Sequence, residues 1–260
     1  MDLKSGYALV GALIAGAAVL GLFAAVGLSW PLVVVAIVAG LVGYIVGAAA
    51  ARSTTSITAF GEFMRGWLIG MNAAFNAVIW FGLVGGGVGA GIGAVVGIFA
   101  FLSVFAPISQ SEAYQAILGW LNWLMPMSWV IVGLGLLFLL VSALLYLVTI
   151  GKVAYLKIDK ADADWKTGTF FIKGGLISNL NPIDTAFNMG TFSFVDTKSG
   201  PMHTEHEAGH TLNLGAFGSV FHLVGALDEN ATSRHANALS ERLAESNDTG
   251  SSGTNIPMWA

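Results

Sequence analysis

The chain contains no cysteine among its 260 residues. That absence excludes disulfides, thiolate metal ligands and a cysteine nucleophile, and it leaves the redox compartment open. Charge is also scarce, because charged residues make up 10% of the sequence, against about 25% in a typical soluble domain. The formal net charge is −4, and the sequence has no basic stripe with interleaved aromatic residues. We therefore expect no nucleic-acid partner.

The few charges are unevenly distributed, while apolar residues make up 55% of the chain. Residues 1–151 contain six charged side chains, namely Asp2, Lys4, Arg52, Glu62, Arg65 and Glu112. This asymmetry predicts an α-helical, Gly-rich membrane anchor at 1–151, in contact with the lipid bilayer, and a soluble domain at 152–245. The residues at 246–260 are mostly small and polar, which predicts a flexible tail.

Long apolar runs define the expected membrane spans. Residues 7–28 and 32–51 each have about the 20 residues that a bilayer core requires, and they predict a transmembrane hairpin. Residues 128–150 predict a final span. The apolar stretch 67–107 is interrupted, so the anchor has four or five spans, and 113–125 is too short to cross and suits an interfacial helix.

Basic residues distinguish the two topologies. With four spans, Lys4, Arg52, Arg65 and Lys152 all lie on one side of the membrane, which the positive-inside rule assigns to the cytoplasm. Five spans would put the soluble domain outside. The rule therefore favours an integral membrane protein with a cytoplasmic domain.

Glycines recur at every fourth position in one apolar stretch, at Gly85, Gly89, Gly93 and Gly97. Such a repeat places a face without side chains on a helix, where a second backbone can approach closely. We expect a glycine-zipper packing surface. The partner helix lies within the chain, in another copy of a homo-oligomer, or in a larger membrane complex.

The most informative motif is His206-Glu207-Ala208-Gly209-His210, which has the pattern His-Glu-x-x-His. On a helix, residues four apart project from one face, so both imidazoles can bind one metal ion, with the glutamate between them as general base. Glu229 follows His210 after 18 intervening residues. A carboxylate from a following helix would complete a catalytic zinc site with one open position. We therefore expect Zn²⁺ held by His206, His210 and Glu229, with Glu207 as the base.

Chance matches to this pattern occur, but two further features favour a metal site. All five histidines fall within 33 residues, and they are His203, His206, His210, His222 and His235. Glu229 follows at a suitable distance. His222 is a buried core residue in this interpretation and the alternative ligand if Glu229 is not one. Asp228 is expected to be a helix N-terminal charge, and His203 a capping or surface residue.

The predicted domain begins with a small sheet. The stretches Thr169–Ile177 and Ala186–Val195 are rich in Phe, Ile and Thr, which predicts two short antiparallel segments. A strand at Thr191–Val195 would pair with an extended substrate. The motif helix is expected over 205–214, ending near Gly215.

A buried connector is expected next, over 216–225, followed by a second helix over 228–245 that carries Glu229. A sheet, a helix with His-Glu-x-x-His and a glutamate helix together resemble the zincin metallopeptidases of the gluzincin branch. The resemblance covers roughly 165–245, and the small size is similar to the minimal gluzincins. Metzincin spacing does not fit, because their third histidine would fall at Ala216.

The resemblance implies roles for individual residues. It assigns zinc to His206, His210 and Glu229, and the general base to Glu207. It also implies an acidic residue four positions after the ligand glutamate that supports the first histidine, and that position is Ser233 here. These families use a downstream tyrosine or histidine as an oxyanion donor, and no tyrosine follows Tyr155.

Two functions are compatible with these features. In the first, the protein is a membrane-anchored zinc metallopeptidase that hydrolyses peptide bonds of a peptide or protein substrate. In the second, it is a membrane scaffold or accessory subunit whose zincin-like domain holds metal structurally or no longer turns over. The Gly-rich spans, the small domain and the lack of a matching oxyanion donor favour the second function, whereas the complete motif favours the first.

Overall fold

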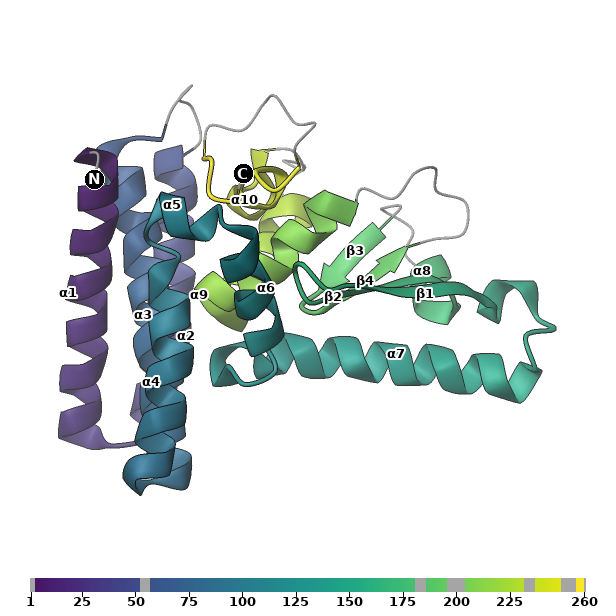
Figure 1. The fold of residues 1–260 in the computed structure, drawn as a ribbon, viewed down its shortest axis with the longest axis horizontal. Helices are drawn as coiled ribbons and strands as arrows, with labels where there is room; N and C mark the ends of the chain where they lie inside the picture. Colours follow the sequence, from purple (N-terminus) through teal and green to yellow (C-terminus); the bar gives the residue numbers. More distant parts are fainter. Residues whose placement is uncertain are drawn as a thin grey trace.

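Four helices stand side by side in a bundle at one end of the molecule (Figure 1). The computed structural model describes residues 3–51, 57–180, 186–195, 204–231, 237–248 and 256–259. The bundle helices are α1 (Leu3–Val26), α2 (Trp30–Ala51), α3 (Ala59–Val84) and α4 (Gly86–Leu102). The first three are long and apolar enough to cross a bilayer, whereas α4 is shorter. The predicted hairpin of apolar helices is present as α1 and α2.

The glycine repeat lies mostly against α3. A Cβ atom built at Gly89, Gly93 or Gly97 would lie 2.5–2.9 Å from backbone carbonyl oxygens of α3. Gly85 instead makes the turn between α3 and α4 with φ 71°, and no other described part of the chain approaches its Cβ position within 4 Å. Three of the four glycines therefore serve helix packing inside the chain.

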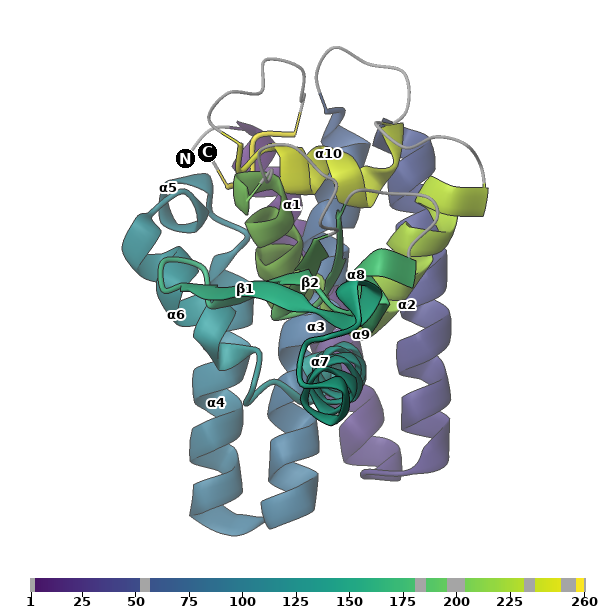
Figure 2. The ribbon, with the colours of Figure 1, turned by 90° about the vertical axis from the view of Figure 1, so that its right-hand side faces the viewer.

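The chain then leaves the bundle through short helices and a long one. These are α5 (Ala106–Ser109), α6 (Glu112–Leu121), η1 (Pro126–Ser128) and α7 (Trp129–Thr149). Residues Pro126–Thr149 are the fourth segment long and apolar enough to cross a bilayer. However, α7 lies crosswise to α1–α4, and the sheet covers one of its faces (Figures 1 and 2). Its opposite face exposes leucines, among them Leu140, Leu144 and Leu147.

A four-stranded mixed sheet packs on α7. It contains β1 (Ile158–Asp164), β2 (Thr169–Gly174), β3 (Ala186–Met189) and β4 (Phe192–Val195), with η2 (Ala154–Leu156) before β1 and α8 (Leu176–Leu180) after β2. The strand order is β1-β2-β4-β3. The pairs β1–β2 and β3–β4 are antiparallel, but β2 and β4 are parallel.

The prediction of an antiparallel sheet is therefore wrong for its central pair. The chain passes through α8 to the far edge, forms β3 there, and turns back so that β4 fills the space beside β2. Because β4 is paired on both sides, the stretch Thr191–Val195 has no free edge for an extended substrate, which corrects that expectation as well.

Helix α9 (Thr204–Ala231) carries the histidine motif, and α10 (Leu239–Glu245) follows it. Gly218 interrupts α9 with φ 81° and ψ 177°, a conformation open essentially to glycine alone. The helix therefore passes the expected end at Gly215 and resumes after Gly218, so the predicted connector 216–225 is largely helical. Phe217 and Phe221 lie on either side of the break, and both are buried with their rings stacked at a centroid distance of 4.4 Å, which anchors both stretches of α9 in the core.

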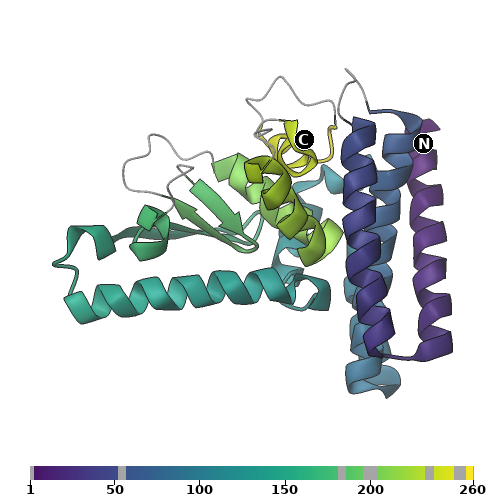
Figure 3. The same ribbon diagram turned by 180° about the vertical axis from the view of Figure 1, so that it is seen from behind.

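One buried cluster joins the two halves of the chain. It includes Leu68 and Phe75 of α3 together with Phe217 of α9, Leu243 of α10 and Trp259. The expected boundary after residue 151 therefore does not divide the packing, because α9 and α10 share a core with the bundle (Figure 3).

Residues 256–259, called the 256–259 strap below, also belong to this core. The indole N–H of Trp259 donates to Asn213 Oδ1 over 2.9 Å, and the backbone carbonyl of Trp259 accepts from Gln115 Nε2 over 2.6 Å. Ser246, at the end of α10, accepts from the Trp259 backbone N–H over 3.1 Å. The prediction of a flexible tail is therefore wrong for these four residues, which fasten α10 to α9 and α6.

Candidate metal site

Three side chains from two helices converge at one point. His206 and His210 extend from α9, with their Nε2 atoms 3.2 Å apart. Glu241 of α10 places one carboxylate oxygen 3.1 Å from His206 Nε2 and the other 3.3 Å from His210 Nε2. Among the described residues, this is the one group of three metal-ligating side chains close enough to hold an ion.

The spacing suits zinc. Zinc binds histidine nitrogen at about 2.0–2.1 Å, so ligand atoms at the corners of a tetrahedron lie roughly 3.3 Å apart. The two Nε2 atoms, 3.2 Å apart, are close to that value, and one ligand atom from each of the three residues lies within 4.8 Å of the others. Two imidazoles and one carboxylate are also a donor set of catalytic zinc sites. The residues present therefore fit a zinc ion with one position left open.

The predicted third ligand, Glu229, does not belong to this group. It lies on the second stretch of α9, beyond the break at Gly218. Its neighbour Asp228 accepts a hydrogen bond from Tyr44 Oη over 3.1 Å, and it lies within α9 instead of at a helix N-terminus as expected. Ser233, expected to replace the supporting acid, lies outside the described residues.

His222 is a buried core histidine, as predicted, and not the alternative ligand. Its Nε2 donates to the Asn188 carbonyl over 2.9 Å. Burial lowers the pKa of His222 to about 4, so the ring is neutral near pH 7. His222 therefore stabilises β3 and does not join the metal-ligating group.

A glycine brings α10 onto the motif helix. Gly209 lies inside the motif, and a Cβ atom built there would lie 2.3 Å from the Ala244 carbonyl oxygen. Any side chain at position 209 would push α10 away. The close approach places Glu241 beside both histidines.

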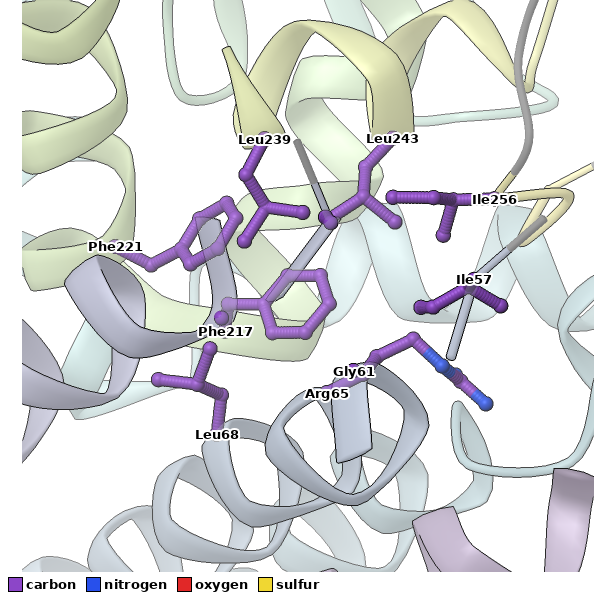
Figure 4. Close-up of a pocket in the computed structure, with 11 residues that line it drawn as sticks. Ile57, Gly61, Arg65, Leu68, Phe217, Phe221, Leu239, Leu243 and Ile256 are labelled. Carbon is purple, nitrogen blue, oxygen red and sulfur yellow. The ribbon is translucent and has the colours of Figure 1, made fainter. Parts of the chain in front are cut away.

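The opposite face of α10 borders an apolar pocket (Figure 4). Leu239 and Leu243, four residues apart, point into it, whereas Glu241 points to the histidines. The pocket encloses about 270 Å³, including space open to solvent. Its lining also includes Ala51 of α2, Arg65 of α3 and Phe217 of α9, so these three helices meet α10 there.

A second carboxylate supports the first histidine. Glu245 Oε2 lies 2.7 Å from His206 Nδ1, so Nε2 faces the metal position and Nδ1 faces Glu245. A carboxylate at this position fixes the imidazole ring and increases its basicity. Glu245 follows Glu241 by four residues, which places both on one face of α10.

Charge at the site is balanced between the histidines and Glu241. Burial lowers the pKa of His206, but the hydrogen bond and charge of Glu241 outweigh it and raise that pKa to about 9. The same opposition of burial and Glu241 raises the pKa of His210. Burial raises the pKa of Glu241, but the two histidines outweigh it and hold that pKa well below its usual range. A metal cation would displace protons from the imidazoles, because neutral imidazole is the ligand.

Glu207, the expected base, is buried between α9 and the sheet. Its Oε2 accepts a hydrogen bond from Ser193 Oγ of β4 over 3.2 Å. Burial raises the pKa of Glu207, although the charges of His210 and His206 oppose the shift. A raised carboxyl pKa favours proton transfer near neutral pH.

Polar contacts fix α9 to the sheet next to the motif. Thr211 Oγ1 donates to the Gly190 carbonyl over 2.7 Å and accepts from Thr169 Oγ1 over 2.8 Å. Asn188 Nδ2 donates to the Glu207 carbonyl over 2.9 Å. Thr211, which directly follows the motif, and Glu207 within it are thereby tied to β2, β3 and the turn before β4.

The bundle and the end of α6 hold α9 from the other side. Asn72 Nδ2, on α3, donates to the Gly215 carbonyl over 2.9 Å. Asn122 Nδ2 donates to the Thr211 carbonyl over 3.0 Å. The Gly215 carbonyl lies next to the break at Gly218, where regular helical pairing ends, and the Asn72 amide supplies it with a donor.

No protein-family model, curated protein or solved structure matches this chain. The site therefore has to be interpreted from its own geometry. Sequence reasoning missed Glu241, Glu245 and Ser193. The four-residue spacing of the two glutamates places them on one helical face, but it does not indicate that this face meets the histidines.

Proposed function

We propose that the protein is a membrane-anchored, zinc-dependent metallopeptidase. One observation carries the proposal, namely the convergence of His206, His210 and Glu241, with the buried carboxylate of Glu207 in electrostatic contact with both histidines. Two neutral ligands, one anionic ligand and an adjacent base are the groups that hydrolytic zinc sites require.

The position of Glu245 gives independent support. The resemblance to gluzincins implies an acidic residue four positions after the ligand glutamate and in contact with the first histidine. Taking Glu229 as ligand placed Ser233 there, which did not fit. Taking Glu241 as ligand places Glu245 there, and its carboxylate lies 2.7 Å from His206 Nδ1.

The residues then have distinct roles in hydrolysis. Zn²⁺ held by His206, His210 and Glu241 would supply Lewis-acid polarisation of the scissile carbonyl. Glu207 accepts a proton from the attacking water and delivers it to the leaving amine. Ser193 donates to Glu207 Oε2 and so limits the orientations of the base.

A pair of glutamine variants tests this function. Glu207→Gln should retain about one zinc per chain, because Glu207 is not a ligand, and should abolish hydrolysis of a peptide library. Glu205→Gln is the matched control, since Glu205 is exposed and two residues away, and it should keep both properties. Metal content is measured by elemental analysis of the purified full-length protein and hydrolysis by mass spectrometry.

Two outcomes would contradict the proposal. Unchanged hydrolysis in Glu207→Gln would remove its role as base. A wild-type protein that carries zinc and hydrolyses no member of the library would instead favour the structural role of a membrane scaffold.

A further inference from the structure

The third metal ligand lies next to the end of an apolar helix. Arg242, which follows Glu241, donates a hydrogen bond to the carbonyl of Ala51, the last residue of α2. Residues Trp30–Ala51 are long and apolar enough to cross a bilayer. With this helix crossing a bilayer, its final residue would lie near one edge of the hydrocarbon core.

The start of α3 marks the same level. Thr58 caps α3, and Glu62 and Arg65 follow in its first two turns as a buried ion pair of 2.9 Å. Charged side chains are costly in hydrocarbon and concentrate near span ends. Ile57 and Gly61, from the same end of α3, line the pocket under α10 (Figure 4).

Helix α10 therefore covers the ends of two apolar helices at once. Leu239 lies against Gly47 in the last turns of α2, where a Cβ atom would be 3.4 Å from its side chain. All three views place α10 at the end of the bundle where α1 begins (Figures 1, 2 and 3). With α1–α3 crossing a bilayer, the metal site would lie at the level of one bilayer surface.

The site is partly exposed on the side of Glu245. The side chains of His206 and His210 are 17% and 13% exposed, and that of Glu245 is 41% exposed. The apolar pocket and the bundle close the other side of α10. A peptide bond has to reach the histidines from the exposed side, close to the membrane surface.

We propose that the substrate is a polypeptide tethered to the same bilayer and cleaved close to where it leaves the hydrocarbon. This inference rests on the proposed peptidase function and names its substrate class. A tether confines the substrate to the membrane surface and raises its effective concentration at the site. Because the site lies close to the bilayer surface, it reaches the peptide bonds that lie next to the membrane tether of the substrate.

The test uses one randomised segment in three forms. The segment has about 20 residues, which extend to roughly 65 Å. It is prepared free, fused directly to a single transmembrane helix, and fused through an uncleavable D-amino-acid spacer of about 20 residues. Each form is incubated with the full-length zinc-loaded protein in phosphatidylcholine vesicles, and cut positions are mapped by mass spectrometry.

The inference predicts cuts within about five residues, or roughly 17 Å of extended chain, from the transmembrane helix in the directly fused form. The free segment should be cut at least about 10-fold more slowly, since it lacks the effective-concentration advantage. The spacer form should lose most cleavage despite its tether. Vesicles with the Glu207→Gln variant supply the background.

The outcomes separate the two proposals. Equal cleavage of the free and fused segments, or cuts spread evenly along the fused segment, would overturn the membrane-tethered substrate and leave the peptidase intact. Efficient cleavage of the spacer form would do the same. No cleavage of any form by zinc-loaded protein would overturn the peptidase function itself.

Discussion

The second stretch of α9, after Gly218, and helix α10 both follow the histidine motif, both carry carboxylates and both touch α2. They differ in how they pack. The α9 stretch exposes Leu223 and Leu227, which are 42% and 65% exposed. Helix α10 has seven residues, yet Leu239 and Leu243 are 7% and 1% exposed.

The difference shows what brings a carboxylate to the two histidines in this chain. The α9 stretch is nearer to the histidines in sequence, but the break at Gly218 separates it from the motif helix. The more distant α10 reaches the histidines because Gly209 and two buried leucines dock it there. Packing, and not distance along the chain, therefore positions the carboxylate.

The largest expected effect is on zinc affinity, when the carboxylate of α10 is removed and compared with removal of the carboxylate on α9. Glu241→Ala should weaken zinc binding on the order of 1,000-fold, since zinc binding energies of about 10–16 kcal/mol are distributed over three or four ligands. Glu229→Ala should leave the affinity unchanged. Competition titration with a zinc chelator measures both. A loss of zinc affinity in Glu229→Ala but not in Glu241→Ala would make Glu229 the third ligand and contradict the comparison between α9 and α10.

Truncating one leucine in each helix should show how much the packing of that helix contributes to stability. Leu243→Ala removes a buried side chain and should lower the free energy of unfolding by about 2–4 kcal/mol. Leu227→Ala changes an exposed side chain and should stay within about 0.5 kcal/mol. Denaturant titration of the purified protein in detergent compares them. Equal losses would mean that α10 is not the better-docked helix.

Neutralising the supporting carboxylate should have a smaller effect on zinc. Glu245→Gln keeps the shape but removes the charge beside His206 Nδ1, so zinc affinity should fall about 10–100-fold. Glu229→Gln is the matched control and should bind zinc like the wild type. If Glu245→Gln binds zinc normally, its contact with His206 does not influence the metal.

The smallest effect is expected at the 256–259 strap. Trp259→Phe removes the donor to Asn213 Oδ1 and leaves that buried oxygen without a partner, which should cost about 1–2 kcal/mol of stability. Trp30→Phe is the control, because Trp30 is 77% exposed. Identical unfolding curves for the two variants would show that the strap does not hold α10.

Local features of the site followed from the sequence. The positions of His206 and His210 on one helical face depend only on their four-residue spacing, and their Nε2 atoms do lie 3.2 Å apart. The apolar helices α1 and α2 were also predictable, since the length and composition of an apolar run are enough to identify it as a candidate span. Such features need no knowledge of distant contacts.

Other features depend on contacts that a sequence pattern does not contain. Glu241 reaches the histidines because Gly209 admits the backbone of α10, and nothing near Glu241 in sequence indicates this. The break at Gly218 instead of Gly215 reflects an apolar core on one side and the Asn72 amide on the other. The parallel pairing of β2 and β4 likewise depends on the path through α8.

The docking of α9 and α10 on the bundle also has a consequence for the order of assembly. The hydrogen bonds Asn72–Gly215, Tyr44–Asp228 and Arg242–Ala51 join residues separated by 143, 184 and 191 positions. Contacts between such distant residues form slowly, and ribosomes produce the bundle helices first. The bundle is therefore the template on which the two histidines and Glu241 are later brought together, so a mutation that delays insertion of α2 or α3 would delay formation of the candidate site without touching one of its residues.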